Sequence, residues 1–106
     1  MRYEILKKEV RVSESLEEKI DRKVAKIDAR LKRYHPDVAH LEIRLGYLEK
    51  MKEFECALQL TAFKNSLHTK KSAPELRVAV DKSFEALLRE LEHYRLKINK
   101  SLQASR

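Results

Sequence analysis

The chain has 106 residues, with 24 lysine and arginine residues against 17 aspartate and glutamate residues, which gives a net charge of +7. This length fits one domain with a modest core and excludes a second core or a repeat array. The single cysteine, Cys56, cannot form an intrachain disulfide, and no segment is apolar enough for a signal peptide or a membrane span. These features predict a cytoplasmic protein, and the excess of cations favours a polyanionic partner, most commonly nucleic acid.

The first two elements are a strand and a helix. Residues 3–12 predict the strand, because apolar residues alternate on either side of a basic break near Lys8. In the helix, residues 15–18 match a capping box, Ser13 is a competing N-cap, and Pro36 predicts the end. The apolar face repeats at helical spacing through Leu16, Ile20, Val24, Ile27, Leu31 and Tyr34.

Three strand patterns follow at residues 39–45, 54–62 and 67–70, each with one apolar and one polar face. A second helix is predicted from a capping-box pattern at residues 72–75 to about Leu102. Such a helix would span about 45 Å against about 33 Å for a ten-residue strand, so its end should extend past the sheet. The order predicts an α+β fold, β-α-β-β-β-α, with a four-stranded, mostly antiparallel sheet and both helices packed on one face. The apolar face of the second helix comprises Leu76, Val80, Phe84, Leu87, Leu88, Leu91, Tyr94 and Ile98.

The charges on both predicted helices are separated by sign. A helix that needs only solubility would intersperse them, because opposite charges at i,i+4 stabilise it. The alternative is that these are ordinary solvated faces. We expect two parallel basic ridges on the helical layer, suited to a phosphate backbone. The ridge residues are Lys19, Arg22, Lys23, Lys26, Arg30 and Arg33 on the first helix, and Lys82, Arg89, His93, Lys97 and Lys100 on the second.

The sequence gives little support for base stacking, metal binding or catalysis. The strands lack the paired exposed aromatics that stack bases, so binding should follow the shape and phosphates of folded RNA. Tyr47 and Phe63, at strand ends, are interpreted as edge-of-core residues, and Cys56 as a small core residue. No histidine has metal-ligand spacing, no nucleophile adjoins a base, and the lone Gly46 excludes a phosphate-cradling loop. We therefore predict no catalytic residue, no metal site, no cofactor and no small-molecule substrate.

Two other partners are conceivable for basic amphipathic helices. A membrane surface requires free apolar faces, whereas the predicted sheet needs both helices as its cover, so we predict no membrane binding. A basic protein-interaction module that modulates another regulator, such as a sigma factor, without binding RNA remains the alternative.

The sequence resembles the family of ribosome hibernation promoting factors and ribosome-associated inhibitors, whose members are also known as modulators of an alternative sigma factor. Residues 10–34 are similar to the family's valine–hydroxyl lead into the first helix and to its Lys-apolar and basic-Tyr steps. Residues 75–97 are similar to its acidic opening, its Ala-apolar-Asp step and the leucine-rich, basic ending of its second helix. The resemblance extends over residues 3–100.

The resemblance implies one ribosome-binding domain over residues 1–106, without enzymatic activity. Family members occupy the messenger and transfer RNA channel of the small ribosomal subunit, block translation and store ribosomes in an inactive state. The chain would lack the C-terminal dimerisation domain of the family's long forms, which implies a monomer off the ribosome. Position by position, the implied contacts to ribosomal RNA fall on Lys19, Lys26, Arg33, Arg89, Arg95 and Lys97.

The sequence departs from the family pattern on the second helix. Arg77 replaces a usual aromatic residue, and Glu90 stands where glutamine is usual. Glu92 and His93 replace basic residues, which lowers the positive field there.

Overall fold

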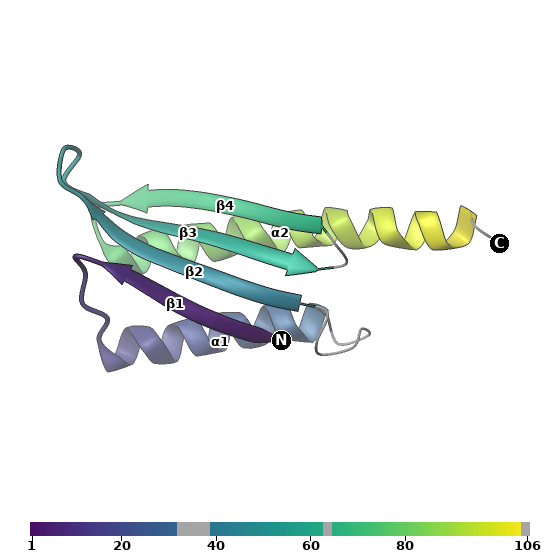
Figure 1. Cartoon of the computed structure of the whole chain (residues 1–106), viewed down its shortest axis with the longest axis horizontal. Coiled ribbons are helices and arrows are strands. Elements are labelled where there is room, and N and C mark those ends of the chain that lie inside the picture. Colours follow the sequence, from purple (N-terminus) through teal and green to yellow (C-terminus); the bar gives the residue numbers. More distant parts are fainter. Residues whose placement is uncertain (32–38, 63–64, 105–106) are drawn as a thin grey trace.

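The computed structural model describes residues 1–31, 39–62 and 65–104, with the backbone alone for residues 65 and 94–104. Two layers make up the molecule, a sheet and a pair of helices that cover one of its faces (Figure 1). In chain order the elements are β1 (Arg2–Lys8), α1 (Glu14–Arg30), β2 (Ala39–Leu48), β3 (Glu53–Ala62), β4 (Asn65–Ala73) and α2 (Leu76–Ala104). This order confirms the predicted β-α-β-β-β-α fold.

The sheet has four strands in the order β1-β2-β3-β4. β1 runs parallel to β2, because α1 connects them as a crossover, while the other neighbours are antiparallel hairpin partners. α2 packs on β3 and β4, and its second half extends beyond the sheet, as its length predicted (Figure 1).

The core lies between the two layers. Alternate residues of β2 and β3, such as Leu41, Ile43 and Leu58, are buried against the helices, while His40 and Arg44 point the other way into solvent. From the helices the core receives the predicted apolar faces, among them Ile20, Ile27, Val80, Phe84, Leu87 and Leu91. Tyr34 lies outside the described residues, and Tyr94 and Ile98 are described in their backbone alone.

The first strand and the first helix both end earlier than predicted. β1 stops at Lys8, because Glu9 has a φ of 57°, in the left-handed region, where the chain turns toward α1. Val10 and Val12, predicted in the strand, instead pack against the core from the connecting segment. α1 ends at Arg30, with Leu31 as its C-cap; Pro36, the predicted stop, lies in residues 32–38, outside the described ranges.

Both predicted capping boxes are wrong. At α1 the competing Ser13 is the N-cap, and its Oγ accepts a hydrogen bond from the Leu16 amide at 3.2 Å. Ser72 cannot cap α2, because it belongs to β4, where it is paired with Glu55. The first turn of α2 forms instead on the Glu75 carbonyl, which accepts from the amides of residues 78 and 79. β4 consequently runs over nine residues rather than the predicted four.

Cys56 is a core residue, as predicted, and is fully buried. Burial raises the pKa of its thiol to about 12, although a hydrogen bond with Ser83 acts in the opposite direction. Ser83 is itself buried and lies 2.9 Å from the Thr69 hydroxyl, which also donates to the Ser83 carbonyl. These polar groups therefore satisfy one another inside the core.

Native Cys56 should resist alkylation. The thiolate is the reactive form, and both burial and a pKa of about 12 suppress it in the folded protein. We expect iodoacetamide at pH 8 to modify the unfolded chain in guanidinium at least about 100-fold faster than the native chain. The measurement is the mass shift against time under both conditions. Equal rates would mean that β3 does not place Cys56 in the core.

Candidate nucleic-acid interface

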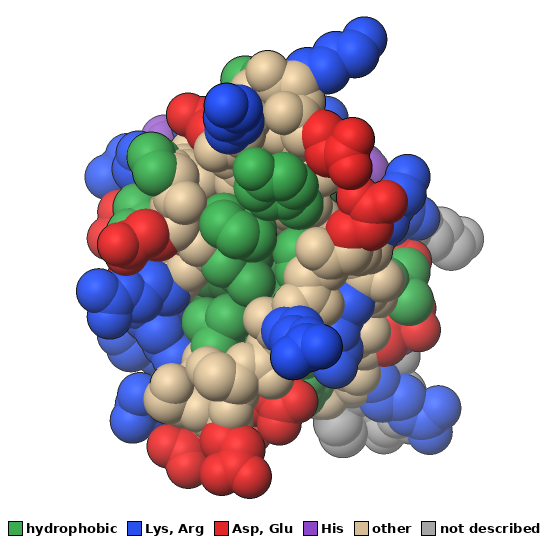
Figure 2. Space-filling model, turned by 90° about the vertical axis from the view of Figure 1, so that its left-hand side faces the viewer, with side chains coloured by type: hydrophobic (Ala, Val, Ile, Leu, Met, Phe, Trp, Pro, Cys, Tyr) green, Lys and Arg blue, Asp and Glu red, His purple; other side chains and the backbone are tan. Residues whose placement is uncertain are grey.

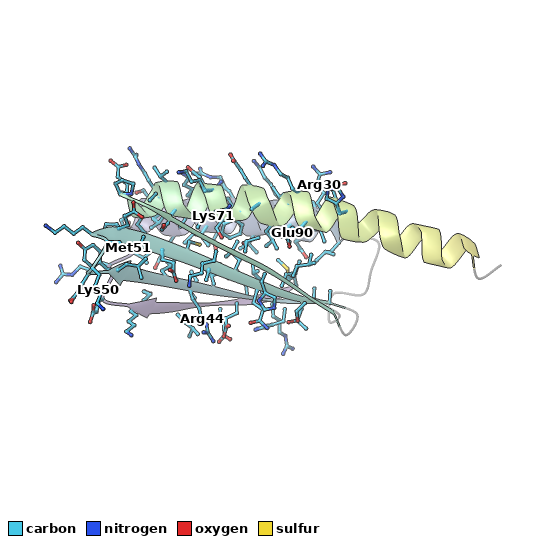
Figure 3. The ribbon with its side chains drawn as sticks, turned by 90° about the horizontal axis from the view of Figure 1, so that it is seen from above. Arg30, Arg44, Lys50, Met51, Lys71 and Glu90 are labelled. Carbon is cyan, nitrogen blue, oxygen red and sulfur yellow. The ribbon has the colours of Figure 1, made fainter. Side chains whose placement is uncertain are left out.

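The uncovered face of the sheet is polar, and several of its charges lie in pairs, although Arg2 and Lys8 on the edge strand β1 have no acidic partner in the described ranges. Arg44 bonds to Glu42 at 3.1 Å, His40 lies 3.5 Å from Glu4, and the Lys70 ammonium lies 3.6 Å from Glu55. Figure 3 shows Arg44 on the side of the sheet away from the helices, whereas Arg30 lies on the helix side. Such paired charges offer little net field to a polyanion.

No aromatic side chain in the described ranges lies on this open face. By strand register Tyr3, Tyr47 and Phe54 all belong to the helix-facing side of the sheet. Tyr47 and Phe54 are half-buried and contact each other edge to face, with centroids 5.0 Å apart, as expected of edge-of-core residues. Phe63, for which the same position was predicted, lies outside the described residues. The open face thus has no platform for base stacking, and the helical layer is the candidate interface.

The basic flank of α1 faces acidic residues of α2. Asp81 forms ion pairs with two lysines of α1. The Lys19 ammonium lies 2.7 Å from one carboxylate oxygen, and the Lys23 ammonium lies 2.9 Å from the other. Further along, Arg30 lies 3.1 Å from a carboxylate oxygen of Glu92. Three of the six ridge cations predicted on this helix are therefore engaged with the neighbouring helix.

The acidic flank of α1 faces the first strand instead. The Tyr3 hydroxyl donates a hydrogen bond to Asp21, and the N-terminal amine of Met1 donates to Asp28 at 3.3 Å. The hydrogen bond to Asp21 and partial burial raise the pKa of the Tyr3 hydroxyl. The separation of charge on α1 thus has a structural cause as well, since each flank meets complementary groups on a different neighbour.

The contacts of Asp81 with Lys19 and Lys23 join the two helices across the surface of the molecule. Desolvation raises the pKa of Asp81, but hydrogen bonds from both lysines outweigh it, so the pKa lies below its ordinary value. A lowered native pKa means that the carboxylate stabilises the fold above its unfolded pKa of about 3.9, and that this contribution is lost as the pH falls through the native value.

We expect Asp81→Asn to lower the free energy of unfolding by about 0.5–1 kcal/mol at pH 7, the range for partly exposed ion pairs. The difference from the wild type should shrink as the pH falls below about 4, from the unfolded pKa towards the lowered native one. Urea titrations at pH 7 and pH 3 measure both values. A difference that is unchanged at pH 3 would show that the ion pairs are not its source.

The remaining ridge cations with described side chains are exposed. Arg22 and Lys26 project outward from α1, and Lys82 and Arg89 from α2; none has an acidic partner in the part of the chain that the structure describes. His93 is exposed as well. Of the other predicted residues, Arg33 lies outside the described residues, and Arg95, Lys97 and Lys100 lie on α2 without described side chains.

The structure adds three cations that the sequence analysis did not include. Arg11, beside the start of α1, lines a hollow of about 410 Å³ together with Lys19, Arg22 and Arg77. Lys70 and Lys71 of β4 line a hollow of about 470 Å³ against α2. The pair of adjacent lysines is visible in the sequence, but helical periodicity does not detect cations that lie on a strand. Figure 2 shows the end of the molecule where both helices begin, with an apolar centre bordered by Lys and Arg side chains on two sides.

The described ranges contain no group of three or more His, Cys, Asp or Glu residues that could hold a metal ion. No described helix is long and apolar enough to cross a membrane.

Two solved structures share the fold. The N-terminal domain of Protein Y from Thermus thermophilus superposes with a TM-score of 0.68 at 12% identity, over 85% of this chain and 93% of that one. A ribosomal subunit interface protein from Coxiella burnetii superposes with a TM-score of 0.71 at 16% identity, over 91% and 99%. A search of curated proteins found no match.

The sequence itself shows which family the chain belongs to. Residues 3–99 match the family described as sigma 54 modulation protein / S30EA ribosomal protein, and the chain belongs to that family. Membership confirms the predicted resemblance and the prediction of a non-enzymatic protein.

Proposed function

We propose that the protein binds the small ribosomal subunit in the channel for messenger and transfer RNA and keeps ribosomes inactive. The observation that carries this proposal is the contrast between the two faces. Arg22, Lys26, Lys82 and Arg89 are exposed on the helical layer without acidic partners in the described ranges, whereas on the open sheet face Arg44 and Lys70 lie against acids and the cations without such a partner, Arg2 and Lys8, lie on the edge strand β1. Exposed cations on a rigid layer bind phosphates by releasing condensed counterions.

Family membership supports a ribosomal partner for this surface. The family description includes a ribosomal protein, and the Coxiella relative is a ribosomal subunit interface protein. A site between the subunits, where ribosomal RNA is exposed, would present phosphates to a cationic layer of this kind. We also propose that the protein acts in the cytoplasm and is a monomer when it is not bound to a ribosome.

Sedimentation tests the ribosomal partner. Purified protein mixed with small subunits should sediment with them through sucrose at about 50 mM salt and be released as salt approaches about 500 mM, because phosphate contacts weaken steeply with salt. Protein that stays at the top of the gradient at low salt would contradict ribosome binding. It would favour the alternative, a module that binds a protein regulator.

A competition experiment tests where on the small subunit the protein binds. If the protein occupies the channel, then small subunits preloaded with messenger RNA and initiator transfer RNA should bind it much less than empty subunits do. In a cell-free translation reaction, protein added before the messenger should inhibit more than protein added after initiation. Equal binding to empty and loaded subunits would place the protein elsewhere on the ribosome.

A further inference from the structure

The exposed cations of α2 face β4 and not α1. Lys82 and Arg89 line one wall of the hollow of about 470 Å³ that Lys70 and Lys71 line from β4. Among the described residues of its lining, Glu85 is the single acid. Cations therefore stand on both walls of this hollow, which we call the β4–α2 groove.

Strand register explains how two adjacent lysines reach the same groove. Lys71 is paired with Cys56, whose side chain is buried beneath the helices, so Lys71 belongs to the helix-facing side of the sheet. Because β4 is an edge strand, its lysine chains can extend past the rim into solvent, and Lys71 is exposed. Lys70 alternates to the open side and borders the groove from there, near Glu55.

A line of paired charges separates this groove from the exposed cations of α1. Asp81 and Glu92 project from α2 toward α1, where they meet Lys19, Lys23 and Arg30. Lys82 and Arg89 lie about 80–100° further around α2 from Asp81. The exposed cations of the helical layer and of β4 therefore form two tracks: the α1 track, Arg22 and Lys26, and the β4–α2 groove, where cations outnumber the single acid Glu85 among the described lining residues.

We propose that the β4–α2 groove is a second site for RNA backbone, so that one domain holds two separate segments of ribosomal RNA at once. The proposal rests on the proposed function and replaces the expected pair of parallel ridges with two tracks divided by ion pairs. A groove with cations on both walls suits the phosphates of a single strand. Two separated tracks would fix the orientation of the domain, because phosphate contacts position a protein without reading sequence.

Three variants that each remove two positive charges test the proposal. Lys71→Gln with Arg89→Gln alters the groove, Arg22→Gln with Lys26→Gln alters the α1 track, and Arg2→Gln with Lys8→Gln alters the open side of β1 as a matched control. Affinity for purified small subunits is measured at several salt concentrations. Each track variant should bind about tenfold more weakly at 0.1 M salt. In a plot of the logarithm of the binding constant against the logarithm of the salt concentration, its slope should be shallower by about 1.4–1.8. The control should match the wild type in both respects.

Hydroxyl-radical footprinting of the ribosomal RNA in the same complexes distinguishes two tracks from one. The wild type should protect two backbone segments, and each track variant should lose protection of a different one. A groove variant that binds like the control, or track variants that lose the same segment, would overturn the second site. Failure of the wild type to bind subunits would instead overturn the proposed function, and the groove proposal with it.

Discussion

Lys26→Glu combined with Arg89→Glu should weaken binding to the small ribosomal subunit by about 100-fold or more at 0.1 M salt. The two changes reverse one cation in each track, so they remove two attractive contacts and add two repulsive ones. The net charge falls from +7 to +3, since each reversal subtracts two. Fluorescence anisotropy of labelled protein against subunits at fixed salt measures the loss.

Stability should be nearly unchanged in this variant. Both residues are exposed and have no acidic partner in the described ranges, and such surface substitutions usually stay within about 0.5 kcal/mol. A glutamate at position 26 would pair with Arg22 and Arg30 one turn away, whereas one at position 89 would face Glu85, so the helical effects oppose each other.

A variant with the same change of charge but at a distant site separates specific contacts from overall attraction. Arg2→Glu with Lys8→Glu lowers the net charge equally, on the open side of β1. We expect this control to bind within about threefold of the wild type at 0.1 M salt, where the screening length is about 10 Å. If it loses as much affinity as the first variant, net charge alone drives binding and the helical layer has no special role.

The pattern of apolar residues was sufficient to predict the architecture. Alternation at residues 39–45 and helical spacing from Leu16 to Leu31 and from Leu76 to Leu91 reflect the burial of one face, which is the main physical constraint on each element. Local capping was predicted less well. Ser13 and Ser15 both match an N-cap by sequence, and the helix begins where the Ser13 side chain accepts from the Leu16 amide, which local sequence does not determine.

The charge pattern predicted which residues are exposed but not which charges meet. Helical spacing puts Asp81 and Glu92 on one flank of the second helix and Lys19, Lys23 and Arg30 on one flank of the first. Whether those two flanks face each other depends on how the helices lie on the sheet, and strand order and crossover determine that. The lysines of β4 join the interface for the same reason, because only the fold brings an edge strand beside α2.

The largest loss of stability is expected for Phe84→Ala. Among the residues whose side chains the structure describes, Phe84 is the largest that is fully buried, at 1% exposed, and it lies on the helix that covers β3 and β4. Truncation of a buried phenylalanine costs about 3–5 kcal/mol through lost transfer energy and the cavity left behind. The free energy of unfolding of a domain of this size is about 5–15 kcal/mol in total. The loss should therefore lower the melting temperature by about 15 °C or more.

Glu90→Ala is the matched control, since this exposed side chain lies on the same helix and its loss should change stability by no more than about 0.5 kcal/mol. A Phe84→Ala protein that melts with the wild type would contradict the packing of α2 on the sheet. Below its melting temperature the variant should still bind small subunits, because none of the exposed cations is altered. Saturating subunits should then raise its melting temperature as they raise that of the wild type, since a ligand that binds only the folded state stabilises it. Loss of binding by the folded variant would mean that the core also sets the spacing of the two tracks.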